Sequence, residues 1–232
     1  MDSSSTSLII IAVIVLVYAA LLAYYCMLEK KEKFWPATIL KVILSAYASG
    51  CCVYAAIMLN NYVFYIFALG MIFAVPADYF LQYIKSDLTK YRFGILFFGL
   101  MHICLIVSFY IIYAVTIYEF IIFALLIGIL LAFQIVGKWK MGKEKTQLTI
   151  YTVLVVFMAA KAISLYFTIP NPATFILMLS LGGLFFFLSD LFLGIWAYSK
   201  EKFVYLALNR IIYFAGQLCL AFYLVTLLLL SQ

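Results

Sequence analysis

Apolar stretches of about 20 residues, separated by short polar segments, dominate this chain. A helix needs about 20 apolar residues to cross a hydrocarbon layer ~30 Å thick. The pattern therefore predicts an all-α bundle of eight transmembrane helices, at residues 8–27, 36–58, 62–84, 92–113, 115–136, 148–168, 173–197 and 204–230. Because no connection is long enough to form a soluble domain, we expect one transmembrane domain over residues 1–232.

The composition excludes a soluble globular protein. Hydrophobic residues make up 69% of the chain and charged residues 10%, whereas the apolar share of soluble domains is about 45–50%. The first apolar stretch has no basic segment before it and no convincing small-residue cleavage site after it, so we expect a retained helix, not a signal peptide. The five cysteines lie at membrane depth without metal-ligand spacing, which favours small core residues over disulfides or metal ligands.

Lysine and arginine residues occupy every second connection between the predicted helices. The second, fourth and sixth connections have none. The basic connections hold Lys30, Lys31 and Lys33; Lys85, Lys90 and Arg92; Lys138, Lys140, Lys143 and Lys145; and Lys200 and Lys202. The positive-inside rule places these connections in the cytoplasm and both termini outside. The net charge of +6 is then a topology signal and a contact for membrane lipids, and no nucleic-acid partner is expected.

Two aspartates stand in nearly identical sequence surroundings inside predicted spans. The pattern Leu69-Gly70-x-x-Phe73-x-x-x-x-Asp78-x-Phe80-Leu81 recurs 112 residues later as Leu181-Gly182-x-x-Phe185-x-x-x-x-Asp190-x-Phe192-Leu193. This recurrence predicts two parallel four-helix repeats, approximately residues 1–114 and 115–232, with Asp78 and Asp190 facing each other near a shared axis. A carboxylate in hydrocarbon costs ~3 kcal/mol or more, so each aspartate is a functional-site candidate.

Six ionisable residues remain at membrane depth: Lys41, Asp78, His102, Lys161, Asp190 and Arg210. Counting ~1.5 Å per residue along each helix places all except Lys161 in one layer of the cytoplasmic half. Tyr213 lies in that layer, and Gln217 lies one helical turn beyond it. We therefore predict a buried polar cavity, and we expect Lys161 to extend towards the outer interface. The alternative is a structural ion pair between an aspartate and Lys41 or Arg210.

At these residues the chain resembles the YhhN family of eight-span membrane proteins, whose characterised members are lysoplasmalogenases. The resemblance covers the second to eighth predicted helices. It rests on the segments Phe73-Ala74-Val75-Pro76-Ala77-Asp78-x-Phe80-Leu81, Phe98-Gly99-Leu100-Met101-His102 and Ser189-Asp190-Leu191, on Tyr151 through Met158, on Tyr213-x-x-x-Gln217 and on Lys41.

The resemblance implies hydrolysis of the vinyl ether bond of a lysoplasmalogen, which yields a fatty aldehyde and a glycerophospho-base. Protonation of the distal alkene carbon requires a neutral acid and a nearby anion, and two carboxylates in one poorly solvated site suit these roles. No cofactor or metal is expected. The implied catalytic residues are Asp78, Asp190 and His102, and the implied ligands of the lysophospholipid are Lys41, Arg210, Tyr213 and Gln217.

Other functions fit the same pattern of residues. Parallel repeats with intramembrane acids are also typical of proton-coupled or small-solute transporters. A membrane-embedded metal hydrolase would need ligands such as Asp, Asp and His, since one histidine cannot build a His₃ zinc site. A family member without catalytic activity would carry the same residues.

Overall fold

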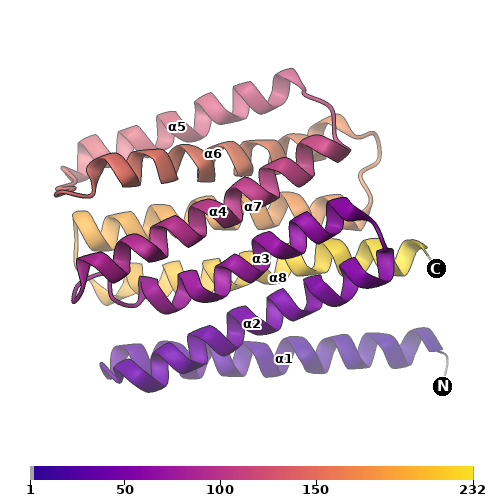
Figure 1. The fold of residues 1–232 in the computed structure, drawn as a ribbon, viewed down its shortest axis with the longest axis horizontal. Coiled ribbons are helices and arrows are strands. Elements are labelled where there is room, and N and C mark those ends of the chain that lie inside the picture. Colours follow the sequence, from indigo (N-terminus) through magenta and orange to yellow (C-terminus); the bar gives the residue numbers. More distant parts are fainter. Residues whose placement is uncertain (1–2, 232) are drawn as a thin grey trace.

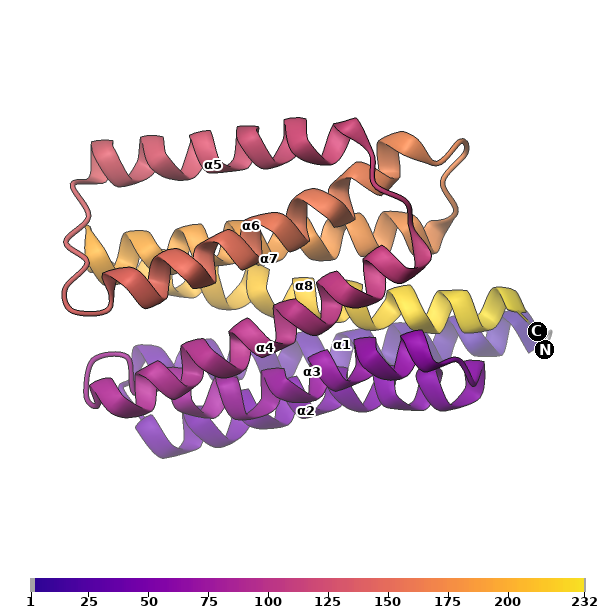
Figure 2. The ribbon, with the colours of Figure 1, turned by 45° about the horizontal axis from the view of Figure 1, so that its top comes forward.

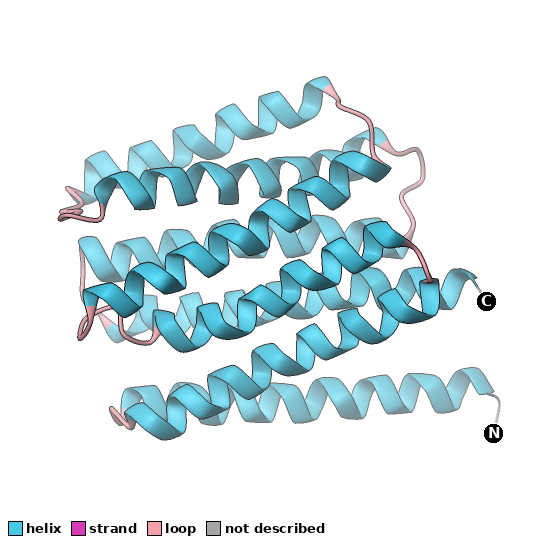
Figure 3. Cartoon of the chain, viewed as in Figure 1, coloured by secondary structure: helices cyan, strands magenta, loops and turns pink. Residues whose placement is uncertain are grey.

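The structure is a computed structural model that describes the backbone of residues 3–231 and the side chains of residues 15–231. The described chain is all-α, with short connections (Figure 3). Its eight helices are α1 (Ser3–Lys30), α2 (Phe34–Leu59), α3 (Tyr62–Leu81), α4 (Leu88–Ile112), α5 (Ile117–Gly137), α6 (Lys145–Thr168), α7 (Thr174–Tyr198) and α8 (Phe203–Ser231). The all-α prediction with eight helices is confirmed.

Seven of these helices, α2 to α8, are long and apolar enough to cross a membrane. The chain is therefore a polytopic membrane protein. The remaining predicted span, residues 8–27, is the first along the chain and lies in α1. The side chains of residues 8–14 are outside the described part. That span stays a prediction.

The helix boundaries differ from the apolar stretches where polar residues form caps. α4 begins at Leu88, four residues before the predicted start, because the Asp87 side chain accepts a hydrogen bond of 3.1 Å from the Lys90 amide. Such an N-cap satisfies an amide that has no partner within the helix. Apolar length thus locates the membrane-crossing part of a helix, and local capping fixes its end.

Successive helices run in opposite directions, so the chain crosses the bundle from end to end eight times (Figures 1 and 2). The four connections that carry lysine and arginine lie at one end, here called the basic end, and the start of α1 and the end of α8 lie at the other (Figure 1). The predicted separation of basic and non-basic connections is therefore present. Assignment of the basic end to the cytoplasm stays a prediction.

Two groups of three helices form the centre of the bundle. α3 packs between α2 and α4, and α7 packs between α6 and α8. The groups meet where α4 contacts α6 and where α2 contacts α8, while α1 and α5 lie outside against α2 and α6 (Figure 2). An axis relating helices 1–4 to helices 5–8 would produce these pairings, but the repeat itself stays a prediction.

The repeated glycines lie where helices approach closely. A Cβ at Gly70 would lie 3.0 Å from Cys104 Cβ on α4, and a Cβ at Gly182 would lie 2.6 Å from Leu220 on α8. Small residues let transmembrane helices pack backbone to backbone. These contacts hold the two aspartate-bearing helices, α3 and α7, in fixed positions against their neighbours.

Candidate active site

Asp78 lies in the bundle core, where side chains of two other helices bind its carboxylate. Its side chain is 1% exposed. Lys41 Nζ on α2 lies 3.2 Å from Asp78 Oδ1, and the Tyr213 hydroxyl on α8 donates a hydrogen bond of 2.6 Å to Oδ2. A buried carboxylate needs both a counter-charge and hydrogen-bond donors, and this arrangement supplies both.

The hydrogen bonds continue away from Asp78 through α8 to α2. Gln217 Nε2 donates to the Tyr213 hydroxyl at 2.6 Å and lies 3.0 Å from Ser45 Oγ. Lys41, Asp78 and Tyr213, predicted from depth to share one layer, and Gln217, predicted one turn beyond it, are therefore brought together. Lys41 is fully buried and does not reach for the interface.

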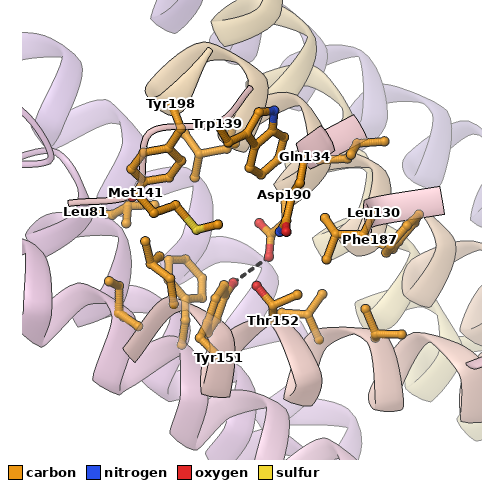
Figure 4. A pocket seen from close by; sticks show the side chains of 18 of the residues that line it. Leu81, Leu130, Gln134, Trp139, Met141, Tyr151, Thr152, Phe187, Asp190 and Tyr198 are labelled. Atoms are coloured by element: carbon orange, nitrogen blue, oxygen red, sulfur yellow. Dashed lines mark hydrogen bonds between the residues drawn. The ribbon is translucent and has the colours of Figure 1, made fainter. Parts of the chain in front are cut away.

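Asp190 on α7 has a different environment. The Tyr151 hydroxyl on α6 donates a hydrogen bond of 2.6 Å to Asp190 Oδ2, shown as the dashed line in Figure 4. Among the described side chains, no lysine or arginine nitrogen lies within 4.0 Å of this carboxylate. In each half of the chain the aspartate thus contacts the preceding helix, through a cation in one half and a phenol in the other.

A small cavity lies between the two aspartates. Its volume of about 10 Å³ is close to the minimum that holds one water molecule. Asp78 and Asp190 both line it, together with Tyr151, Tyr213 and Arg210. The two carboxylates therefore share one hollow, although each is hydrogen-bonded to its own tyrosine.

A second, apolar pocket of about 70 Å³ adjoins this cavity on the Asp190 side. Asp190 and Tyr151 line both spaces, so the pocket ends at the carboxylate. Figure 4 shows Asp190 and Thr152 facing each other across this pocket, with Phe187 and Leu130 on one side. Its wall consists mainly of hydrocarbon and aromatic side chains from α4, α5, α6 and α7.

Arg210 borders the shared cavity from the basic end. Its guanidinium binds the Glu29 carboxylate through two hydrogen bonds of 3.0 Å, from Nε and from Nη2. The Tyr25 hydroxyl and the Gln82 amide also donate to Glu29, at 2.7 and 3.1 Å. Lys41 and Arg210 thus both have carboxylate partners within the protein, and their predicted contact with a substrate phosphate stays a prediction.

His102 lies behind the cavity wall. Its Nδ1 is 2.7 Å from the Phe98 carbonyl oxygen, and its ring meets the Tyr151 ring edge to face at 5.6 Å. Nε2 is buried with no hydrogen-bond partner among the described residues. Neither carboxylate lies within hydrogen-bond distance in that part of the chain, so His102 contacts the site through Tyr151.

The position of Lys161 corrects an expectation from the sequence. Its Nζ lies towards the non-basic end of the bundle, where it donates to the Ala114 carbonyl oxygen and forms an ion pair of 3.0 Å with Glu119 on α5. The side chain is nevertheless 0% exposed and does not reach the membrane surface. It also lies over the Tyr110 ring at 4.5 Å. Glu119, which lies in the first turn of α5, was not predicted as a partner of Lys161.

This ion pair is expected to be structural. Lys161→Met leaves Glu119 buried without its partner, and removal of one member of such a pair costs about 3–5 kcal/mol. We expect a lower midpoint of thermal unfolding in detergent but an unchanged rate per folded molecule for any reaction at Asp190. A selective loss of that activity at full stability would contradict this assignment.

Four residues of the site were not predicted. Tyr151 and Asn209 lie on the cavity wall, Glu29 binds Arg210, and the Trp139 ring covers Gly194 beside the apolar pocket. Trp139 fits only because position 194 lacks a Cβ, which would collide with the ring. Glu29 and Trp139 each lie just after a predicted span, and this position was the one signal that could have indicated a role near the site. It does not indicate which helix each residue contacts.

The described residues contain no group of three His, Cys, Asp or Glu side chains placed to hold a metal ion. Asp78, Asp190 and His102 therefore do not converge as a ligand set. The five cysteines are free thiols.

Fold and site together define a polytopic helical membrane protein with a buried two-carboxylate site that adjoins an apolar pocket. The model of the YhhN family matches residues 38–224, and the chain belongs to this family, which includes lysoplasmalogenases. No curated protein and no solved structure matched the chain. The match includes every predicted site residue, from Lys41 to Gln217.

Proposed function

We propose that this protein is a membrane-embedded hydrolase that cleaves the vinyl ether bond of lysoplasmalogens. The observation that carries the proposal is the water-sized cavity lined by Asp78 and Asp190. One carboxylate has a lysine partner, and the other, among the described side chains, has a tyrosine hydroxyl as its hydrogen-bond partner and lines an apolar pocket. Because their surroundings differ, one carboxyl group suits the role of neutral proton donor and the other that of an anion.

Asp190 is the proton donor in this proposal. An unpaired carboxylate ion in apolar surroundings is costly, so its neutral acid is the form suited to that position. The proton moves to the alkene carbon distal to the ether oxygen, where the π electrons form the new C–H bond. The remaining positive charge is shared by the other alkene carbon and the ether oxygen, and the Asp190 carboxylate now beside it stabilises the cation.

Water completes the reaction. One water molecule adds to the cationic carbon and loses its proton to a carboxylate, for which Asp78 is the anion that Lys41 maintains. The Asp78 carboxyl then gives this proton to the ether oxygen of the hemiacetal, and the bond between that oxygen and the former alkene carbon breaks. As the aldehyde C=O bond forms, the hemiacetal hydroxyl passes its proton to the Asp190 carboxylate. The products are a fatty aldehyde and a glycerophospho-base, so one water is consumed and both carboxyl groups regain their starting states.

A panel of lysolipids tests this function. The purified protein in detergent is offered alkenyl, saturated alkyl and acyl lysophosphatidylethanolamine in the presence of a strong chelator, and products are identified by mass spectrometry. We expect aldehyde from the alkenyl lipid alone, because only a vinyl ether can be protonated on carbon. Transport of a labelled solute without any aldehyde, or cleavage of the acyl lipid alone, would contradict the proposal.

The apolar pocket is proposed to hold the start of the hydrocarbon chain. Thr152→Phe would fill the space opposite Asp190 (Figure 4). We expect KM for long-chain alkenyl substrates to rise about tenfold, the effect of ~1.4 kcal/mol of lost binding. The matched control is Thr152→Val, which removes the hydroxyl at almost constant volume. Equal effects of both substitutions would show that the pocket does not contact the chain.

A further inference from the structure

An open vestibule of about 480 Å³ lies at the basic end, among the ends of α1, α3 and α7 and the beginnings of α2 and α8. Lys30, Lys33 and Lys85 line it, as do Glu32 and Glu201. Its volume is within the range of ligand pockets, about 300–1,000 Å³. This space is separate from the carboxylate cavity and from the apolar pocket, and the mechanism above does not use it.

One residue joins the vestibule to the reacting site. Arg210 lines the vestibule and also lines the cavity between Asp78 and Asp190. Its ion pair with Glu29, which also lines the vestibule, forms the partition between the two spaces. A molecule in the vestibule is therefore one side chain away from the carboxylates.

The vestibule contains both positively and negatively charged side chains, which suit a ligand that carries a negative and a positive charge. Lys30 and Lys33 are exposed and, among the described side chains, have no acidic partner within 4.0 Å. Lysine is a common phosphate ligand. The Trp196 ring already holds the Lys85 ammonium at 4.2 Å, and exposed Glu201 pairs with the same lysine. An aromatic face beside a carboxylate is a site for an organic cation.

We propose that the vestibule binds the zwitterionic phospho-amine head group of a lysolipid, with the phosphate at Lys30 and Lys33 and the amine in the place of the Lys85 ammonium beside Trp196 and Glu201. This assignment rests on the proposed function for the identity of the lipid. Only the three glycerol carbons separate the phosphate of such a lipid from its ether oxygen. A head-group site must therefore adjoin the reacting cavity, and the shared wall at Arg210 satisfies this requirement.

Equilibrium binding tests the proposal without requiring catalysis. The ligands are saturated 1-alkyl lipids, which contain no vinyl ether and are not cleaved: lysophosphatidylethanolamine, the corresponding phosphate monoester, and neutral alkylglycerol. For wild-type protein in neutral detergent we expect the ethanolamine lipid to bind most tightly. The double variant Lys30→Gln/Lys33→Gln is expected to weaken binding of both phosphate lipids about tenfold and to leave alkylglycerol unchanged.

The control variant is Lys143→Gln, a neutralised lysine at the same end of the bundle that does not line the vestibule. An equal loss in the control and the double variant, or an equal loss for alkylglycerol, would overturn the phosphate assignment. Tighter binding of the phosphate monoester than of the ethanolamine lipid would overturn the amine assignment. Aldehyde release from alkenyl lipids, measured in parallel, decides the proposed function independently of these binding results.

Discussion

Asp190→Asn is expected to abolish most aldehyde release, with kcat lowered about 10²–10⁴-fold, the usual contribution of general acid catalysis. The amide preserves the shape of the side chain and can still accept the hydrogen bond that Tyr151 donates at 2.6 Å. It has no acidic proton to give to the alkene carbon. The rate is measured as aldehyde formed from lysoplasmenylethanolamine per folded protein in detergent.

The matched control for this substitution is Asp87→Asn. Asp87 caps the start of α4 at the basic end, and asparagine is an equally good N-cap. We expect wild-type stability and rate from the control. An Asp190→Asn protein that releases aldehyde at the wild-type rate would remove Asp190 from the mechanism.

The largest expected loss of stability follows from Lys41→Met. This change leaves Asp78, 1% exposed, without the ammonium group 3.2 Å away. Removal of one partner from a buried ion pair costs about 3–5 kcal/mol, whereas replacement of both partners is often close to neutral. The double variant Lys41→Met/Asp78→Asn should therefore be more stable than Lys41→Met alone.

Thermal unfolding in one detergent, followed by tryptophan fluorescence, measures this difference. Both variants should lose activity, since the double variant lacks the Asp78 carboxylate that receives a proton from water. If the double variant were as unstable as the single one, Lys41 would stabilise the bundle through packing of its alkyl chain and not through Asp78.

The sequence predicted the depth of the site residues well because the rise of a helix is nearly constant. Counting residues from the basic connections placed Lys41, Asp78 and Tyr213 at one level and Gln217 one turn beyond it, and the structure joins them by contacts of 2.6 to 3.2 Å. The number of helices followed from apolar length for the same reason, whereas their ends depend on local caps such as Asp87.

Rotation about each helix axis was not predictable from depth, and this explains the residues that were missed. Lys161 faces Glu119 inside the bundle, although its level suggested an interfacial position. Tyr151 stands in a segment that resembles the family, but neither that resemblance nor its depth shows that its hydroxyl donates to Asp190. Glu29 lies in the last turn of α1. From the sequence alone, an acidic residue there that faces the solvent cannot be distinguished from one that binds Arg210.

The central claim is that a carboxylic acid of this site protonates the alkene carbon of a vinyl ether. The most direct measurement is hydrolysis of lysoplasmenylethanolamine by the purified protein in D₂O, with immediate reduction of the aldehyde to the alcohol and analysis by mass spectrometry. We expect one deuterium on the carbon next to the former carbonyl carbon, and about 10²–10⁴-fold slower formation of this product by Asp190→Asn. Aldehyde that carries no deuterium at that carbon, or labelled aldehyde formed equally well by Asp190→Asn, would contradict this claim.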